Sequence, residues 1–157
     1  MKRTYHMFPQ RPEFEQKFSF KADLPYIVTI MAGMDGQFGD FLTDDVKGRQ
    51  VQAKRTINVE VCDKKVDFFP LNTHTIDAIL TDVDPEGTVD FKVKLTYASL
   101  DHKYTRVPIK GDSFLVRANL ENGILKMTIH NTEGMGRTDC ERIADTIVEE
   151  IKRHAPQ

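Results

Sequence analysis

The chain has 157 residues, of which 39% are hydrophobic and 29% charged, and its formal net charge is −2. This length is typical of one domain, and the balance of apolar and charged residues excludes a predominantly disordered chain. The small net charge argues against a nucleic-acid-binding protein, which usually carries a basic excess.

The chain carries no sign of a membrane span or a secretory signal. No stretch approaches the ~18 apolar residues of a transmembrane helix, and no apolar run follows the basic start. Cys62 and Cys140 lie far apart, so neither a disulfide framework nor a zinc knuckle is predicted. We expect a cytoplasmic protein, with a mature exported chain as the alternative. Residues 1–12 are predicted to be a flexible lead-in, and residues 13–157 a single α+β domain.

The first half of the chain predicts strands separated by one long loop. Residues 14–24 carry apolar side chains at even positions, which favours a half-buried strand. Residues 26–31 are apolar on both faces and predict a central strand. Residues 33–48 are rich in Gly and Asp and predict a loop. Residues 51–61 alternate again and predict a further strand.

The next segments continue this pattern. Residues 66–71 and 76–80 are short candidate strands, the first interrupted by Pro70. A turn at residues 84–87, with Pro85 in its second position, should lead into the clearest strand, residues 88–97.

A hairpin and a helix are predicted in the last third of the chain. Residues 104–109 predict a further strand. Residues 114–120 and 124–130 alternate on either side of Asn122-Gly123, a dipeptide that tolerates positive φ at both central turn positions.

From Thr138 to His154 the period changes to that of a helix. Thr138 and Glu141 match a capping box, and Lys152 to His154 suit the helix C-terminus. The apolar stripe that must be covered comprises Cys140, Ile143, Ala144, Ile147, Val148 and Ile151.

These elements predict an α+β fold: a curved antiparallel sheet of roughly seven to nine strands with one C-terminal amphipathic helix packed on it. This order of elements resembles that of helix-grip and lipocalin-like binding proteins in architecture. The chain departs from the helix-grip pattern near residues 33–48, where two short helices after the first strand are not evident.

Three segments carry partial chemical motifs. Residues 82–87 copy the first half of a calcium loop, but Val93 occupies the place of its final bidentate Glu, which favours a simple turn. Residues 131–138 lie between a strand and a helix as a phosphate loop does, but Arg137 replaces the lysine, and a connector is favoured. A helix N-terminus that holds an anion with help from Arg137 stays open.

Acidic residues and one cysteine complete the candidates. Asp35, Asp40, Asp44 and Asp45 could bind a cation if their loop folded back on itself, although a surface loop is favoured. Cys140 at a helix start could have a lowered thiol pKa, but its place on the apolar stripe favours a buried, inert thiol.

No catalytic residue, metal ligand or cofactor is assigned from the sequence. The leading hypothesis is a non-enzymatic module that binds a hydrophobic small molecule or lipid in a sheet/helix cleft. The first alternative is a protein-interaction or assembly subunit, or a homo-oligomer, because residues 31–91 carry an acidic excess and residues 92–126 a basic excess. The second is a metal-dependent enzyme with an acidic loop site. No nucleic acid is expected as a partner.

Overall fold

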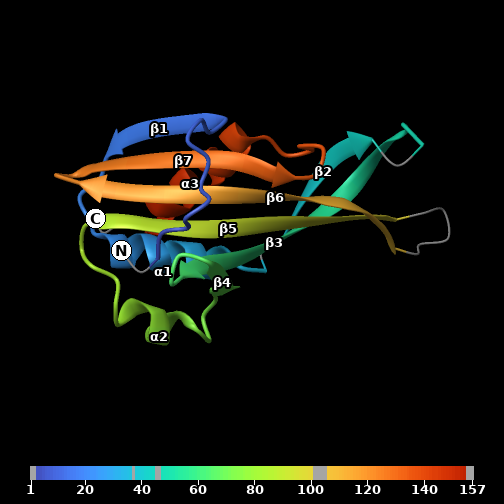
Figure 1. Cartoon of the computed structure of the whole chain (residues 1–157). Coiled ribbons are helices and arrows are strands. Elements are labelled where there is room, and N and C mark those ends of the chain that lie inside the picture. The colour runs from blue at the N-terminus through green and yellow to red at the C-terminus, as the bar shows by residue number, and fades with distance from the viewer. Residues whose placement is uncertain (1–2, 37, 45–46, 101–105, 155–157) are drawn as a thin grey trace.

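The computed structural model describes residues 3–36, 38–44, 47–100 and 106–154, and for residues 38–44, 100, 106 and 107 only the backbone. Figure 1 shows one antiparallel sheet with two helices, α1 and α3, on the same face. The order of elements is β1 (Phe14–Ser19), α1 (Leu24–Met34), β2 (Phe38–Asp44), β3 (Gln50–Asp63), β4 (Asp67–Pro70), α2 (Ile76–Leu80), β5 (Gly87–Leu100), β6 (Arg106–Glu121), β7 (Ile124–Glu133) and α3 (Cys140–His154).

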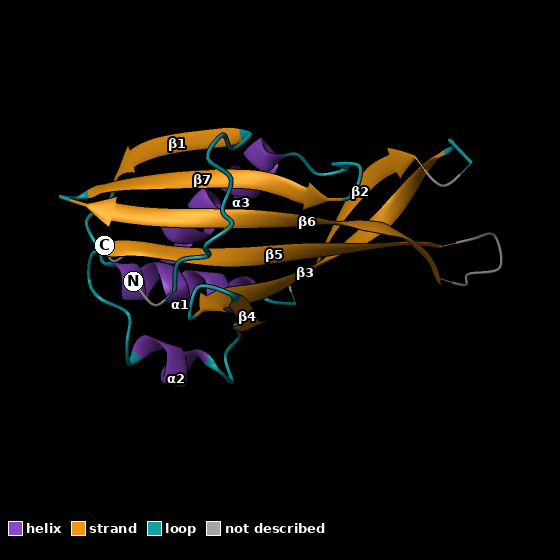
Figure 2. Cartoon of the chain, in the orientation of Figure 1, coloured by secondary structure: helices purple, strands orange, loops and turns teal. Residues whose placement is uncertain are grey.

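The sheet follows the order β1-β7-β6-β5-β3-β2, so the first strand pairs with the last. This path holds six strands, fewer than the seven to nine expected, and the four-residue β4 pairs with β3 off the path. The predicted α+β class, antiparallel sheet and C-terminal helix are confirmed (Figure 2). The far ends of β2, β3, β5 and β6 extend beyond the helices.

Helix α1 replaces the strand predicted at residues 26–31. Asp23 caps it by accepting a hydrogen bond from Tyr26 N at 3.1 Å, and Pro25 occupies its first turn, where no amide partner is needed. The helix is buried on most sides, which removes the helical period from its sequence. A short run that is apolar all round fits a buried strand or a buried helix equally well.

Two further predictions of secondary structure were wrong. Residues 76–80, read as a strand, form α2, so the turn before β5 follows a helix rather than a strand. The loop predicted at residues 33–48 contains the end of α1 and all of β2. Residues 76–80 are too few to show a reliable period, and residues 33–48 are rich in glycine. Tertiary contacts therefore decide the structure of both segments.

The strands in the second half of the chain agree with their predictions. The predicted strand 88–97 lies within β5, and its odd-numbered residues are buried while Lys94 and Thr96 are exposed. The β6–β7 turn has φ of 52° at Asn122 and 75° at Gly123, and Glu121 pairs with Ile124. These are the positive φ values that a tight hairpin turn requires.

Helix α3 is present as predicted, but its cap is different. Asp139, not Thr138, caps the helix, because Asp139 Oδ1 accepts a hydrogen bond from Arg142 N at 2.8 Å. The predicted stripe is buried except for Val148, which is half-buried, and Glu150 joins it with an exposed fraction of 6%.

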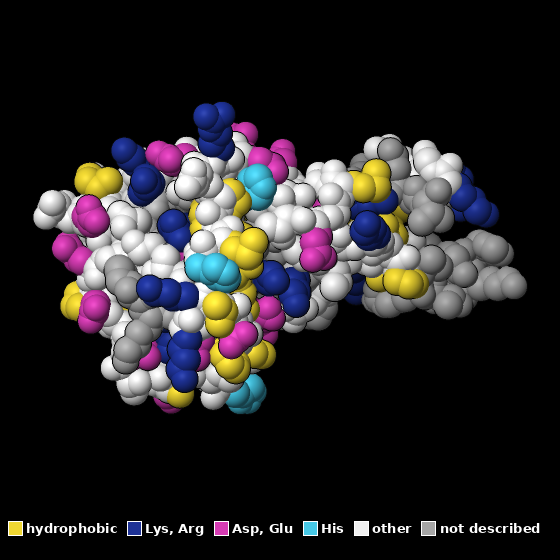
Figure 3. Space-filling view, viewed as in Figure 1, with side chains coloured by type: hydrophobic (Ala, Val, Ile, Leu, Met, Phe, Trp, Pro, Cys, Tyr) yellow, Lys and Arg dark blue, Asp and Glu magenta, His cyan; other side chains and the backbone are white. Residues whose placement is uncertain are grey.

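Residues 3–8 cross the sheet face opposite α1 and α3 (Figure 1). Tyr5 N donates to Asp90 Oδ2 at 2.6 Å, and the Arg117 guanidinium lies over the Phe8 ring, 4.2 Å from its centroid. Hydrophobic and basic side chains gather along the middle of this face in Figure 3. The predicted flexibility of residues 1–12 stays a prediction.

Candidate functional site

A cleft of about 320 Å³ lies between α3 and the inner face of the sheet. Its volume is at the lower end of the range for small-molecule sites, about 300–1,000 Å³. The lining combines an apolar floor with charged side chains at its margins: Met34, Arg55, Ile57, Val93, Leu95, Thr138, Arg142, Ile143, Thr146, Ile147, Glu149, Glu150 and Arg153.

Strand register places the sheet side of this lining. Arg55 pairs with Tyr97 and Ile57 pairs with Leu95 across β3 and β5. Because side chains alternate along a strand, these odd-numbered residues all face the helices. On α3, Arg142, Thr146 and Glu149 recur at steps of four and three residues and form one edge of the cleft.

A chain of hydrogen bonds connects Arg55 to the interior. Arg55 Nη1 donates to Thr138 Oγ1 at 3.0 Å, and Tyr97 Oη lies 3.0 Å from the same hydroxyl oxygen. Tyr97 Oη also lies 2.7 Å from Asp112 Oδ2. A carboxylate only accepts, so the Tyr97 proton goes to Asp112 while the Thr138 hydroxyl donates to Tyr97. This chain fixes the position of the Arg55 guanidinium at the cleft.

Asp112 also holds the connector between β7 and α3. Its side chain accepts hydrogen bonds from Gly136 N at 2.8 Å and Thr138 N at 3.4 Å, and Asp112 is 1% exposed. A Cβ at Gly134, whose φ is +92°, would collide with Asp112 Oδ1 and Gly111 O. Two amides of the predicted connector therefore bind an internal carboxylate.

The two ends of the cleft differ in charge. At the α3 N-terminal end, burial and the nearby Arg142 guanidinium lower the pKa of Arg55. At the other end, Glu150 Oε1 lies 2.9 Å from Arg153 Nη1, and Glu150 Oε2 lies 3.4 Å from His154 Nε2. The first end gathers two positive charges, whereas the second contains a carboxylate with cationic neighbours.

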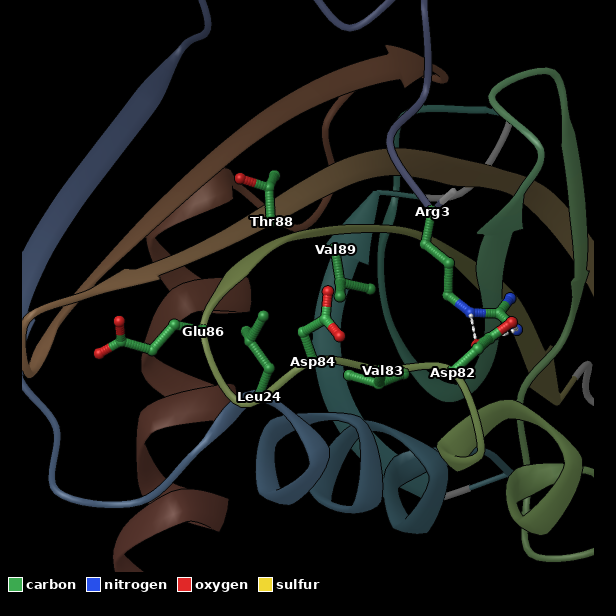
Figure 4. Close-up of a pocket in the computed structure, with 8 residues that line it drawn as sticks. All are labelled: Arg3, Leu24, Asp82, Val83, Asp84, Glu86, Thr88 and Val89. Carbon is green, nitrogen blue, oxygen red and sulfur yellow. Dashed lines mark hydrogen bonds and ion pairs between the residues drawn. The ribbon is translucent and has the colours of Figure 1, made fainter. Parts of the chain in front are cut away.

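A second pocket, also of about 320 Å³, lies at residues 82–87, the segment that resembles the first half of a calcium loop (Figure 4). Arg3 donates to Asp82 Oδ1 at 2.9 Å, and Glu86 lies on the far side of the pocket from Arg3. Asp90 lies elsewhere, with Arg117 Nε 2.7 Å from its Oδ1. Asp82, Asp84 and Glu86 therefore line one pocket and Asp90 does not, and among the described residues no group of three such side chains is placed to hold a metal ion.

The acidic loop candidates are only partly described. Asp35 ends α1, and its Oδ1 accepts a hydrogen bond from Val59 N at 2.7 Å. Asp40 and Asp44 lie in β2, with side chains outside the description, and Asp45 lies outside the described residues. Among the described residues, no group of three or more His, Cys, Asp or Glu side chains could hold a metal ion.

Neither cysteine has the environment of a nucleophile. Burial and the Glu13 carboxylate, 3.5 Å from Sγ, together raise the pKa of the Cys140 thiol to about 12. Burial also raises the pKa of Cys62 to about 11. Both thiols are therefore protonated at neutral pH, in line with the buried, inert interpretation of Cys140.

Comparison with known proteins gives no assignment. No protein-family model matches the chain, and no curated protein or solved structure matches it significantly. In the part of the chain that the structure describes, no helix is long and apolar enough to cross a membrane.

Sequence reasoning did not find the polar residues of the cleft. Arg55, Tyr97 and Asp112 come from three strands and Thr138 from the connector, so only strand register brings them together. The alternation of residues along β3 could have identified Arg55, because it places Arg55 on the same face as Val59 and Val61, which are buried.

Proposed function

We propose that this protein is a non-enzymatic binding module that takes a small hydrophobic molecule or lipid into the cleft between α3 and the sheet. The observation that carries the proposal is the cleft of about 320 Å³ between α3 and the sheet, whose lining includes Ile57, Leu95 and Ile147 from β3, β5 and α3. Burial of apolar ligand surface contributes about 25 cal/mol per Å².

The arrangement of helix and sheet supports this function. The C-terminal helix lies against a sheet in which the first strand pairs with the last, an arrangement that we propose is helix-grip-like. Clefts between secondary-structure layers are frequent ligand sites, with an apolar body and a few fixed polar groups.

The charge pattern gives less support to an assembly subunit. Lys94 Nζ lies 3.5 Å from Glu60 Oε2, and Arg117 Nε lies 2.7 Å from Asp90 Oδ1. Some bases of β5 and β6 therefore pair with acids of the same sheet. Internal pairing accounts for part of the charge asymmetry without a partner protein.

The experiment fills the cleft from the helix side. Thr146 lines the cleft, and its hydroxyl donates only to Arg142 O within the helix, so Thr146→Trp should fold while occupying the ligand volume. The probe is N-phenylnaphthylamine, a neutral dye whose fluorescence rises in apolar sites. The matched control is Asp145→Trp, because Asp145 is exposed on α3 and does not line the cleft.

We expect the dye to bind the wild-type chain and the Asp145→Trp variant with the same affinity, and the Thr146→Trp variant at least tenfold more weakly. Thermal unfolding of all three proteins shows that the helix is intact. No dye binding to the wild type, or equal binding to all three, contradicts the proposed function.

A further inference from the structure

We infer that β1 is a pairing edge at which two copies of this chain form an antiparallel dimer, with Gln16 of each copy at the two-fold axis. This interface is separate from the ligand cleft, because none of the described residues that line the cleft belongs to β1.

Strand β1 lies at one end of the sheet and pairs on one side only. Its neighbour is β7, and among the described residues no strand pairs with its other edge (Figure 1). An edge strand presents unpaired backbone N–H and C=O groups, which can pair with a further strand. Glu15, Gln16 and Lys17 in the middle of β1 are exposed, so this part of the strand is accessible to a partner.

A hydrogen bond at the end of β1 shows which of its backbone groups point outward. Phe20 N donates to Gly123 O at 2.8 Å, directly after the last residue pair of β1 and β7. In an antiparallel pair of strands, hydrogen-bonded and non-hydrogen-bonded residue pairs alternate. The even-numbered residues of β1 therefore bond to β7, whereas the N–H and C=O groups of Glu15 and Lys17 point to the open edge.

The sequence of β1 is complementary to itself in the antiparallel direction. Residues 14–18 read Phe-Glu-Gln-Lys-Phe, so the two opposite charges lie at equal distances from Gln16. When Gln16 lies opposite Gln16 of the second copy, Glu15 of each copy lies opposite Lys17 of the other. These are also the residues with outward backbone groups, so each pair exchanges two N–H···O=C hydrogen bonds. A two-fold interface between identical chains requires this self-complementarity.

The charges of β1 favour this register over others. Charged side chains, and lysine above all, often protect edge strands from association. A register that placed Lys17 opposite Lys17 of the second copy would bring like charges together, which is unfavourable. The register centred on Gln16 instead places each lysine opposite a glutamate.

The second copy also supplies an opposite charge where the chain itself supplies a like one. Lys17 lies directly opposite Lys126 of β7, on the sheet face that lies away from α1 and α3. Like charges in directly opposite positions of two strands destabilise the pair. In the dimer, Glu15 of the second copy lies on the other side of Lys17, so the carboxylate offsets this repulsion.

The helix-covered face of β1 adds aromatic contacts. Phe14 and Phe18 are half-buried and pack against the core. In the same register Phe14 lies opposite Phe18 of the second copy, at a non-hydrogen-bonded position, where side chains approach each other most closely. The dimer therefore has one continuous sheet, with α1 and α3 of both copies on the same face.

Charge-reversal variants test the dimer and its register together. Glu15→Lys places two lysines in β1 and Lys17→Glu places two glutamates there, so each variant should repel its own copy. A mixture of the two variants restores both opposite-charge pairs, and the double variant Glu15→Lys/Lys17→Glu restores them within one chain. Lys152→Glu, at an exposed position of α3, is the control for the change in net charge.

Sedimentation velocity measures the association. One pair of strands is a small interface, so we expect a dissociation constant of about 100 μM for the wild-type chain. Each single variant should associate about tenfold more weakly or not at all. The mixture, the double variant and Lys152→Glu should associate about as tightly as the wild type. Thermal unfolding of each variant shows that the chain is folded.

Hydrogen exchange locates the contact on the chain. The amides of Glu15 and Lys17 point to the open edge, so their exchange should slow as the protein concentration rises through the dissociation constant. The amide of Gln16 bonds to β7 in both states, and its exchange should change much less with concentration.

Three results would overturn the inference. A wild-type chain that is monomeric at about 1 mM has no such interface, and its edge is then available only to a strand of another protein. A dimer that neither single variant weakens uses another surface. Failure of the mixed single variants to associate excludes the antiparallel register. Each of these results leaves the proposed function of the cleft standing.

Discussion

Arg117 and Arg55 lie on opposite faces of the same sheet, and their pKa values are shifted in opposite directions. Arg117 makes two hydrogen bonds to Asp90, of 2.7 and 2.8 Å, and this pairing raises the pKa of Arg117. Arg55 donates to the hydroxyl of Thr138 and lies near Arg142, and burial is the main cause that lowers its pKa.

The difference separates an arginine in a buried ion pair from an arginine whose pKa is lowered mainly by burial. Asp90 is 0% exposed, and its ion pair with Arg117 holds the segment that contains Tyr5 and Phe8 on the outer face. A paired, buried carboxylate requires its cation for stability. Arg55 lines the cleft beside α3 and donates a hydrogen bond to the Thr138 hydroxyl.

The largest expected effect is the loss of the outer pair. Arg117→Gln leaves Asp90 buried without its cation, and the free energy of unfolding should fall by about 3 kcal/mol. Urea denaturation checks this value, and Arg11→Gln, at an exposed position, is the control. A change below about 1 kcal/mol would mean that Asp90 is not held as an ion.

The next effect concerns the carboxylate behind Arg55. Asp112→Asn keeps the shape of the side chain but replaces one carboxylate oxygen with an NH₂ group. This group would face one of the hydrogen-bond donors of Asp112, which are Tyr97 Oη, Gly136 N and Thr138 N. The free energy of unfolding should fall by about 2 kcal/mol, because Tyr97 and Thr138 lose a carboxylate acceptor, and urea denaturation measures the change. An unchanged free energy of unfolding would show that Asp112 does not anchor Tyr97 and the connector.

Arg55→Gln should lower the free energy of unfolding by about 1 kcal/mol, less than Arg117→Gln, because it removes the hydrogen bond to the Thr138 hydroxyl without leaving a buried carboxylate of Asp90 unpaired. The measurement is the same urea titration as for Arg117→Gln. A loss of unfolding free energy as large as that of Arg117→Gln would show that Arg55 stabilises the fold as much as Arg117 does, which would contradict the comparison of the two arginines.

The smallest effect is a pH dependence at alkaline pH. The folded state raises the pKa of Cys62 to about 11 and of Cys140 to about 12, from an ordinary value of 9.0. Between pH 9.0 and about 11, the thiols of the unfolded chain have lost protons that the folded chain retains. The stability contribution is therefore complete below pH 9.0 and declines above it. Cys62→Ala with Cys140→Ala should reduce the slope of unfolding free energy against pH between about 9 and about 11.

Local pattern was sufficient for β3 and for the second half of the chain, and insufficient for α1, β2 and α2. The β6–β7 hairpin and α3 follow from Asn122-Gly123 and from a strongly amphipathic stripe, signals that neighbouring residues carry by themselves. Helix α1 is apolar all round, and its helical signal lay in Asp23 and Pro25 at its start.

The candidate site depends on contacts between distant parts of the chain. Arg55, Tyr97, Asp112 and Thr138 meet because β3 pairs with β5 and because β5 pairs with β6, which places Asp112 opposite Leu95 on the same face as Tyr97. The capping-box prediction assigned Thr138 to the helix, whereas Asp139 caps it and Thr138 turns to Arg55. A one-residue difference at the helix start thus releases the hydroxyl that orients the arginine.

The most direct test of the central claim locates the ligand on the protein. NMR spectra of methyl-labelled isoleucine, recorded as decanoate is added, report on both the cleft and the rest of the molecule. We predict that shifts concentrate at Ile57, Ile143 and Ile147, which line the cleft, while Ile79 and Ile124 do not move. Shifts centred on Ile79 or Ile124, or none at all at saturating decanoate, would contradict the account.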